Sequence, residues 1–470
     1  MSKFKTICSA SRIKVYVVGL FVLGLSLNSF SQKVWSLDDC VNYAIDNNIQ
    51  IKQSEISTES YDIDLLQSKL DIIPSLNAST SYGWSEGRSP DPQTNIYNIQ
   101  NSRQQFYSVN SQITLFNGLQ QYNSIRKAKA DYLASQYDAD KMKDDISLMI
   151  VGGYLQILFS MELVKTAREQ VAITELQVSR TQKLVDAGTL AKGDLLEMLS
   201  QGAREEVNLI NAENQLNLAY LDLLQLLDMT AAERFNIERP NIVIEDASLE
   251  LIPSDKVYEY AVINRPEIKS AEYRLQSAER ALAIARGSRS PIISLSGGWG
   301  TTWSDQIRVI DPDNPLDFSG PTKPYDDQLK DNVNKNWSIS LNIPIFNGYQ
   351  VSSYVSKSKL ASLNAEYNLE LTQNQIRKNV ETSYTDAIAA FKSYLANEKS
   401  LESFSESFKY MEQKFNVGLV NSLDYNVAKQ QMTRAESDLI SAKYDFVFKT
   451  KILDFYMGKT ITLDEFDVQN

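Results

Sequence analysis

The chain has 470 residues, of which 43% are hydrophobic and 23% are charged, a composition typical of a folded protein. Its 47 Lys and Arg residues against 59 Asp and Glu residues give a net charge of −12, which disfavours nucleic acid as a partner. The absence of histidine excludes Ser-His-Asp triads, Cys-His dyads and histidine-containing zinc sites, and two cysteines cannot build a disulfide framework.

Residues 1–31 have the pattern of a secretory signal peptide. Four basic residues precede an apolar run over 15–27, and Ser29-Phe30-Ser31 offers small residues for cleavage. An N-terminal membrane anchor is the alternative, although the run is short for a bilayer span. No later stretch reaches 18 apolar residues, so we expect no transmembrane helix, and a membrane-inserted form would have to be a closed β-barrel. Cys40, which remains in the mature chain, is expected to be a buried core thiol.

Proline placement marks two stretches of the chain that can form long helices. No proline lies between Pro92 and Pro240, and none follows Pro344. Because proline breaks helix interiors, uninterrupted helices are permitted in those two stretches.

The two stretches are predicted to be copies of each other. They match at a constant offset of 230 residues, which places the triplet Phe116-Asn117-Gly118 on Phe346-Asn347-Gly348. Upstream, an offset of 217 places Tyr43-Ala44 on Tyr260-Ala261. A register kept over about a hundred residues indicates an internal repeat.

Each repeat is predicted to contain a helix, a strand, a loop, a strand, a long helix, a turn and a last helix. Repeat 1 covers 32–240, repeat 2 covers 241–457, and 458–470 is a C-terminal tail that, with 229–255, is expected to form a belt around the helices. In repeat 1 we expect helices over 36–72, 118–187 and 190–228, with the two shorter ones stacked end to end beside the long one as in a coiled coil. Strands are expected over 75–86, 107–116, 292–303 and 336–346, with loops over about 85–107 and 304–335.

The four predicted strands alternate apolar residues with Ser, Thr, Asn and Gln, and they carry almost no charge. This pattern is typical of strands with one face toward lipid and the other toward a water-filled lumen, whereas the alternative is an ordinary half-buried sheet. Aromatic residues of the strands are candidates for interfacial girdles: Tyr82, Trp84, Tyr107, Trp299, Trp303 and Trp337. Because four strands cannot close a barrel, we expect an oligomer, and three copies would supply twelve strands.

Together these features resemble the TolC family of outer-membrane efflux proteins. The resemblance rests on the two-repeat plan, the strand-ending Phe-Asn-Gly triplets and two helical hairpin turns near 186–191 and 416–421, and it spans about 34–457. It implies an α+β membrane protein, a homotrimer whose twelve-stranded barrel lies in outer-membrane lipid and continues into a long α-helical barrel across the periplasm. It also implies a passive exit duct for drugs, metals or proteins, whose partners are a periplasmic adaptor (membrane fusion protein) and an inner-membrane pump of RND or ABC type.

By the same resemblance, the two hairpin tips meet the adaptor. The second tip, Val417-Gly418-Leu419, matches the family pattern, and the first tip, Ala187-Gly188-Thr189, matches it less well. The alternative is simple turn chemistry, because glycine ends helices by adopting a positive φ.

Members of this family narrow the periplasmic entrance with acidic residues just past the second tip, and Asp424 takes the first such position. Three copies would form an acidic ring that attracts cations. The alternative is an aspartate that favours a helix N-terminus, which fits Asp194 of repeat 1 equally well. The family's second acidic position is Val427 here, and the basic position that tethers the closed state is Val420. A lone acidic ring and a different latch are therefore expected.

No motif indicates an enzyme, and we expect no catalytic residue, cofactor or bound metal. The pairs Asp144-Asp145 and Glu205-Glu206 are expected to lie on solvated helix faces. Two other functions stay open. A periplasmic adaptor or scaffold of an export system would usually carry one helical hairpin between β-rich halves. A trimeric surface adhesin or stalk would not carry a repeat with paired strands.

Overall fold

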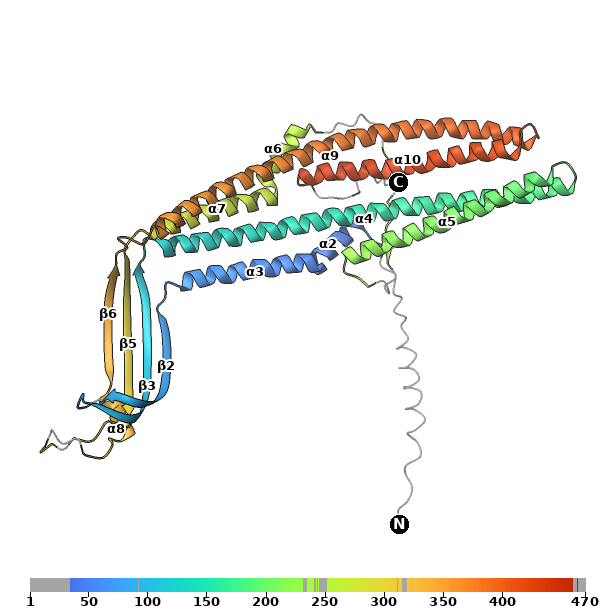
Figure 1. Ribbon diagram of the computed structural model, residues 1–470. Coiled ribbons are helices and arrows are strands. Elements are labelled where there is room, and N and C mark those ends of the chain that lie inside the picture. The colour runs from blue at the N-terminus through green and yellow to red at the C-terminus, as the bar shows by residue number, and fades with distance from the viewer. Residues whose placement is uncertain are drawn as a thin grey trace, which may run out of the picture.

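The computed structural model describes residues 34–459, apart from 92, 231–234, 241, 243, 245–251, 311 and 315–318, together with residue 463. The predicted signal segment and most of the predicted C-terminal tail lie outside these residues. Long helices run beside one another, with a four-stranded sheet at one end and two hairpin turns at the other (Figure 1).

The helices of the two halves correspond one to one in length. The first half contains α2 (Leu37–Asn47), α3 (Ile49–Leu70), α4 (Gln120–Asp186) and α5 (Lys192–Leu226). The second half contains α6 (Ser254–Asn264), α7 (Pro266–Gly287), α9 (Gln350–Asn416) and α10 (Ser422–Tyr456). In both halves these helices have 11, 22, 67 and 35 residues, in that order. As expected, the shorter helices of the first half follow each other along α4 (Figure 1).

The expectation of one continuous helix over 36–72 is wrong, because the helix breaks at Asn48. This residue is extended, with φ −60° and ψ 130°, and its side-chain oxygen caps α3 by accepting from the backbone N–H groups of Gln50 and Ile51. Its amide nitrogen donates to the carbonyl oxygen of Leu226 at 2.9 Å, at the end of α5. Asn48 therefore joins the two shorter helices where they meet.

Arg265 makes the equivalent break in the second half. It corresponds to Asn48 at the offset of 217, has φ −66° and ψ 134°, and precedes Pro266, which begins α7. Its guanidinium donates to the carbonyl oxygen of Phe455 at 3.4 Å, near the end of α10. Both halves thus use the residue at the break to hold the end of the last helix.

The main sheet contains β2 (Ser75–Pro90), β3 (Tyr97–Phe116), β5 (Ile292–Ser304) and β6 (Asn334–Asn342), all antiparallel and in that order. Within the described residues, the outer edges of β2 and β6 have no partner strand. The expected loop over 85–107 is wrong, because β2 and β3 continue their pairing as far as Pro90 and Tyr97. The longer connection between β5 and β6 contains a short helix, α8 (Tyr325–Asp331).

A second, two-stranded sheet lies beside the helices. It pairs β1 (Val34–Trp35) with β4 (Asn236–Ile237) in parallel. The hydroxyl of Tyr154 on α4 donates to the carbonyl oxygen of Glu238 at 2.8 Å, and burial raises the pKa of this tyrosine. The segment that connects the halves is thereby fixed to the middle of α4.

The main core surrounds the middle of α4, where α2, α5 and β4 pack on it. Cys40 is fully buried there, as expected. Among the described helices, α4 alone is long and apolar enough to cross a membrane by length and composition. Because Ile150, Val151 and Ile157 are fully buried, the apolar residues of α4 form a core in this structure.

The strand-to-helix junctions have the same backbone in both halves. Gly118 and Leu119 have φ values of 67° and 61°, and Gly348 and Tyr349 have values of 59° and 67°. Two successive left-handed residues turn the chain from the strand into the long helix, and glycine takes the first position at no steric cost. The surroundings differ, because Gly118 packs against the end of α7 whereas no described atom lies within 4 Å of a Cβ built on Gly348.

Candidate functional site: the hairpin tips, the helix ends and the sheet

The two predicted tips have the same turn geometry. Gly188 has a φ of 73° and Gly418 a φ of 76°. The N–H after each glycine donates to a carbonyl oxygen five residues earlier, from Thr189 to Leu184 and from Leu419 to Lys414, both at 2.9 Å. The positive φ of each glycine is therefore required by the turn itself, independently of any contact with a partner.

The side chains of the two tips differ. Val417 and Leu419 at the second tip are 71% and 74% exposed, so this tip presents an apolar surface. At the first tip Ala187 is small, and the Thr189 hydroxyl donates back to the Leu184 carbonyl oxygen at 2.8 Å. Of the two, the second tip offers the larger apolar side chains to a partner.

The two aspartates considered for the entrance both lie in the first turn of a helix, Asp194 in α5 and Asp424 in α10. Asp194 accepts a hydrogen bond from the Ser422 hydroxyl at 3.0 Å, so it faces the other hairpin of the same protomer. Asp424 is exposed, and its backbone N–H donates to the Asn421 side chain at 2.8 Å. In a single protomer, Asp424 is therefore the more available of the two for a ring between protomers.

Two valines lie beside the second tip: Val420, at the family's basic tether position, and Val427, at its second acidic position. Val427 is 46% exposed on α10, and Val420 is half-buried just after the turn. Between them, Tyr425 is fully buried, with its ring stacked on Phe415 at 4.7 Å and near Phe408 at 5.4 Å. Burial raises the pKa of Tyr425 to about 12. These aromatic contacts bind α10 to α9, and sequence reasoning missed them.

The expectation of a solvated acidic pair at 205–206 is wrong for Glu205, which is only 8% exposed, whereas Glu206 is exposed. The Glu205 carboxylate lies 3.8 Å from the Nζ of Lys429, which is 2% exposed and comes from α10. A buried charge is costly unless it is paired, so this ion pair explains how both residues can lie inside. No feature of the sequence distinguishes Lys429 from the many lysines on helix surfaces.

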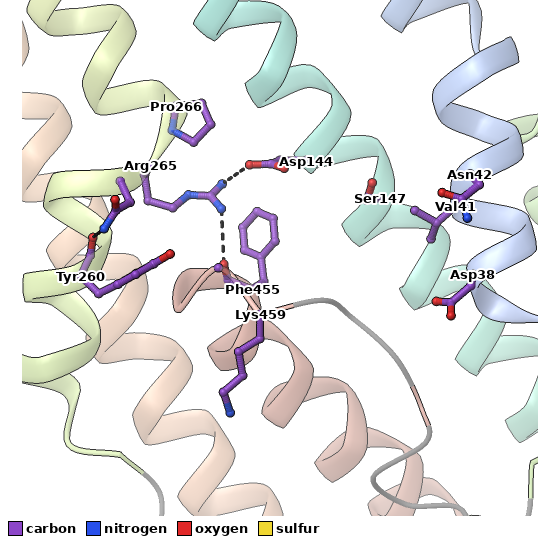
Figure 2. Close-up of a pocket in the computed structure, with 12 residues that line it drawn as sticks. Asp38, Val41, Asn42, Asp144, Ser147, Tyr260, Arg265, Pro266, Phe455 and Lys459 are labelled. Carbon is purple, nitrogen blue, oxygen red and sulfur yellow. Dashed lines mark hydrogen bonds and ion pairs between the residues drawn. The ribbon is translucent and has the colours of Figure 1, made fainter.

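Asp144 also differs from the solvated residue that was expected. Its carboxylate pairs with Arg265 at 3.1 Å, and the guanidinium lies 3.9 Å from the ring centre of Phe455 (Figure 2). Burial raises the pKa of Asp144, and the nearby positive charge of Arg265 opposes that shift. The sequence signal for the break at Arg265 was Pro266, which disfavours helix at the residue before it.

These groups line a cavity of about 500 Å³ between α2, α4 and the ends of α6 and α10. Asp38 of α2 and Lys459 border the same cavity on other sides (Figure 2). The cavity lies far along the helices from the tips, so it belongs to the junction of the helix ends and not to the entrance.

The six candidate girdle residues all lie on one face of the sheet, because the strand register aligns them. Tyr82 and Trp303, for example, both lie opposite Gln105. They do not form a single row, since Trp337 pairs with the middle of β5 whereas Trp84 lies nearer the far end of β2.

Helix α8 covers part of this aromatic face. The hydroxyl groups of Tyr107 and Tyr325 lie 2.7 Å apart, and the rings of Trp303 and Tyr325 lie 5.7 Å apart. The Thr301 hydroxyl, on the same face, donates to the carbonyl oxygen of Leu329 at 2.7 Å. Tyr107 and Trp303 are therefore partly covered by the chain itself, which alternation along the strands could not indicate.

Comparison with known proteins agrees with this architecture. A profile of the family described as "Outer membrane efflux protein" matches residues 40–228 and 257–459. The chain is 21% identical to outer membrane protein TolC of Vibrio cholerae over 96% of both chains. It is also 21% identical to alkaline protease secretion protein AprF of Pseudomonas aeruginosa, over 97% of this chain and 90% of that one. The solved structure of CusC has the same fold, with a TM-score of 0.75, 16% identity, and coverage of 92% of this chain and 96% of that one.

The chain belongs to the outer membrane efflux protein family. It is an exit duct of a tripartite efflux or secretion system, and it lies in the outer membrane and extends into the periplasm. The family consists of transport channels and not of enzymes. The resemblance to the TolC family that the sequence indicated is thereby confirmed.

Proposed function

We propose that the chain acts as a homotrimer, in which three sheets close into one twelve-stranded barrel and the helices form a continuous periplasmic tube. The observation that carries this proposal is the sheet, which has an exposed apolar face and, within the described residues, two unpaired edges. An open edge cannot exist in lipid, because its backbone N–H and C=O groups would lack partners. Joining β2 of one protomer to β6 of the next removes every edge at once.

The apolar face supports a defined membrane band. At the junction end, a β-bulge between Thr114 and Phe116 places Phe116 opposite Ile293, on the apolar face. At the far end, Tyr107 and Trp303 meet Tyr325 of α8. Aromatic rings thus bound the apolar face at both ends.

The distance between these two aromatic positions fits an outer membrane. The strand from Ile293, opposite Phe116, to Thr301, opposite Tyr107, rises about 26 Å. At a tilt of about 40° this corresponds to roughly 20 Å across the membrane, compared with an apolar band of about 25 Å in such barrels. Lipid would cover the face between the two positions, with Trp299 and Trp337 inside the band, and α8 would lie at the outer interface.

The other end of the tube suits a periplasmic adaptor, which would dock on the hairpin tips. The exposed Val417 and Leu419 supply an apolar contact at the second tip, and the first tip supplies a smaller and more polar one. An inner-membrane pump of RND or ABC type would supply the energy, and the duct itself acts passively, without catalysis. Adaptor contact would open the entrance that the second hairpins narrow.

Asp424 is the residue we assign to the narrow entrance. Because it is exposed in the protomer, three copies can face a common axis and favour cations there. In planar bilayers, Asp424→Ala should lower the cation-over-anion permeability ratio by at least about twofold, because one change removes three charges from the ring.

Asp194→Ala is the matched control, because it removes the same charge from the same turn of the other hairpin. Its carboxylate faces Ser422 within the protomer, so the permeability ratio should change little. Equal effects of the two substitutions would contradict the acidic ring at Asp424. A trimer without any conductance would contradict the proposed duct.

A further inference from the structure

Helix α10 has two faces of opposite character near the tip. Toward α9, its partner in the second hairpin, it presents aromatic residues. Tyr425 packs on Phe408 and Phe415, and further along Phe446 packs on Phe391 at 5.3 Å. Apolar contacts of this kind hold α9 and α10 together as one unit.

Toward the first hairpin, formed by α4 and α5, the same helix presents polar residues at heptad spacing. We call this set the polar seam: Ser422, Asn426, Lys429 and Glu436. The Ser422 hydroxyl lies 2.7 Å from the Glu197 carboxylate, and the amide nitrogen of Asn426 lies 3.6 Å from the sulfur of Met198. Farther from the tip the contact becomes apolar, because Val447 is fully buried in the main core.

Lys429 is the most completely enclosed charge of the polar seam. Its Nζ donates to the Thr174 hydroxyl at 2.5 Å and to the Gln170 carbonyl oxygen at 3.3 Å, both on α4. The same atom lies 3.8 Å from Glu205 of α5. One side chain of the second hairpin is thus held by both helices of the first.

A polar contact of this kind is suited to a pair of hairpins that separate and come together again. Burial lowers the pKa of Lys429, with Glu205 opposing the shift, because the closed seam withholds water from the ammonium group. Separation of the hairpins would return water to both charges, so the cost of parting a polar seam is smaller than that of parting an apolar one. The side-chain oxygen of Gln170 is buried without a hydrogen-bond partner among the described residues, which also favours hydration on opening.

We propose that Lys429, bound to Thr174, Gln170 and Glu205, is the latch that holds the second hairpin against the first in the closed duct. It takes the place of a latch at Val420, whose side chain cannot form a hydrogen bond or an ion pair. The proposal rests on the proposed function, because a latch has meaning only if the second hairpins move.

The test measures conductance of purified trimers in planar bilayers, with a double-mutant cycle. Lys429→Met leaves the Glu205 carboxylate buried without its counter-charge, with only the hydrogen bond from Gln201, so the closed state should weaken and mean conductance should rise at least about fivefold. Glu205→Gln leaves the ammonium unpaired and should also raise conductance. The double variant removes both charges and leaves neither one buried alone, so the effects of the two substitutions should be less than additive.

Lys409→Met is the matched control, because it removes one positive charge from an exposed side chain of α9 that pairs only with Glu406 among the described residues. It should leave conductance within the wild-type range. If Lys429→Met does not assemble, Thr174→Val carries the test, since it removes only the shortest contact and should raise conductance less.

The possible outcomes distinguish failure of the proposed latch from failure of the proposed duct. Conducting trimers in which Lys429→Met behaves like Lys409→Met, or in which the effects of the two single substitutions add, overturn the latch alone. A wild-type protein that forms no conducting trimer overturns the proposed function and the latch with it. A double variant whose conductance stays above that of the wild type but falls short of the sum of the two single effects is the result that we expect.

Discussion

Gly118→Ala is expected to lower the stability of the protein by about 2–5 kcal/mol, because it combines backbone strain with a steric clash. Gly118 has a φ of 67°, which costs an alanine about 1–2 kcal/mol. A Cβ at this position would lie 2.5 Å from the Cβ of Ser290 and would also meet the carbonyl oxygen of Gly287. The measurement is the thermal unfolding midpoint of the purified protein, together with the fraction recovered as trimer.

Gly348→Ala is the control within the same chain. Gly348 occupies the equivalent junction with a φ of 59°, but no described atom lies within 4 Å of its added Cβ. Only the strain of about 1–2 kcal/mol should remain. Equal losses of stability at the two glycines would contradict the close packing of the first junction on α7.

Arg265→Met is expected to destabilise the protein by about 3 kcal/mol, because it leaves acidic groups without their counter-charge. Arg265 is 5% exposed, pairs with Asp144 at 3.1 Å and Glu267 at 3.4 Å, and lies over the ring of Phe455. The loss should be near the lower end of the range for breaking a buried ion pair, since the Asp144 side chain keeps some contact with water. Methionine retains much of the apolar packing, and unfolding midpoints of wild type and variant measure the effect.

The pH dependence of this variant separates charge from packing. Burial raises the pKa of Asp144 above its ordinary value of 3.8, and loss of Arg265 should raise it further. A carboxyl group with a raised folded-state pKa binds a proton more readily when folded, so stability falls as the pH rises through that pKa. The deficit of Arg265→Met should therefore shrink as the pH is lowered toward the ordinary carboxyl range. A deficit independent of pH would indicate lost packing and not an unpaired carboxylate.

Much of the fold could be predicted because two kinds of periodicity repeat along the chain. The offset of 230 residues between the Phe-Asn-Gly triplets marks equivalent strand ends, and in the structure α4 and α9 begin at equivalent points after Phe116 and Phe346. Alternation along the strands depends only on a period of two residues, and the register places the selected aromatic residues on one face.

The helix break at Asn48 was missed because asparagine is tolerated inside helices as well as at their ends. The informative residue was Pro266 in the other repeat, since the offset of 217 carries its break back to Asn48. A repeat should therefore be interpreted with both copies aligned, because a breaker in one copy locates the break in both.

The buried ion pairs could not be predicted, because they depend on which helices meet. Lys429 and Glu205 come from different repeats and lie in amphipathic patterns of ordinary appearance. The same holds for Asp144 and Arg265. Helical periodicity identifies the face of a residue, but contact between two hairpins decides whether that face is solvated.

Single-particle imaging of the detergent-purified mature protein tests the central claim most directly. We expect a threefold tube with a short belt at membrane depth. Its length should be about 130 Å, from a 67-residue helix of about 100 Å and a barrel of about 30 Å. A monomer that stays soluble without detergent, or a solid rod without a lumen, would contradict the trimeric duct.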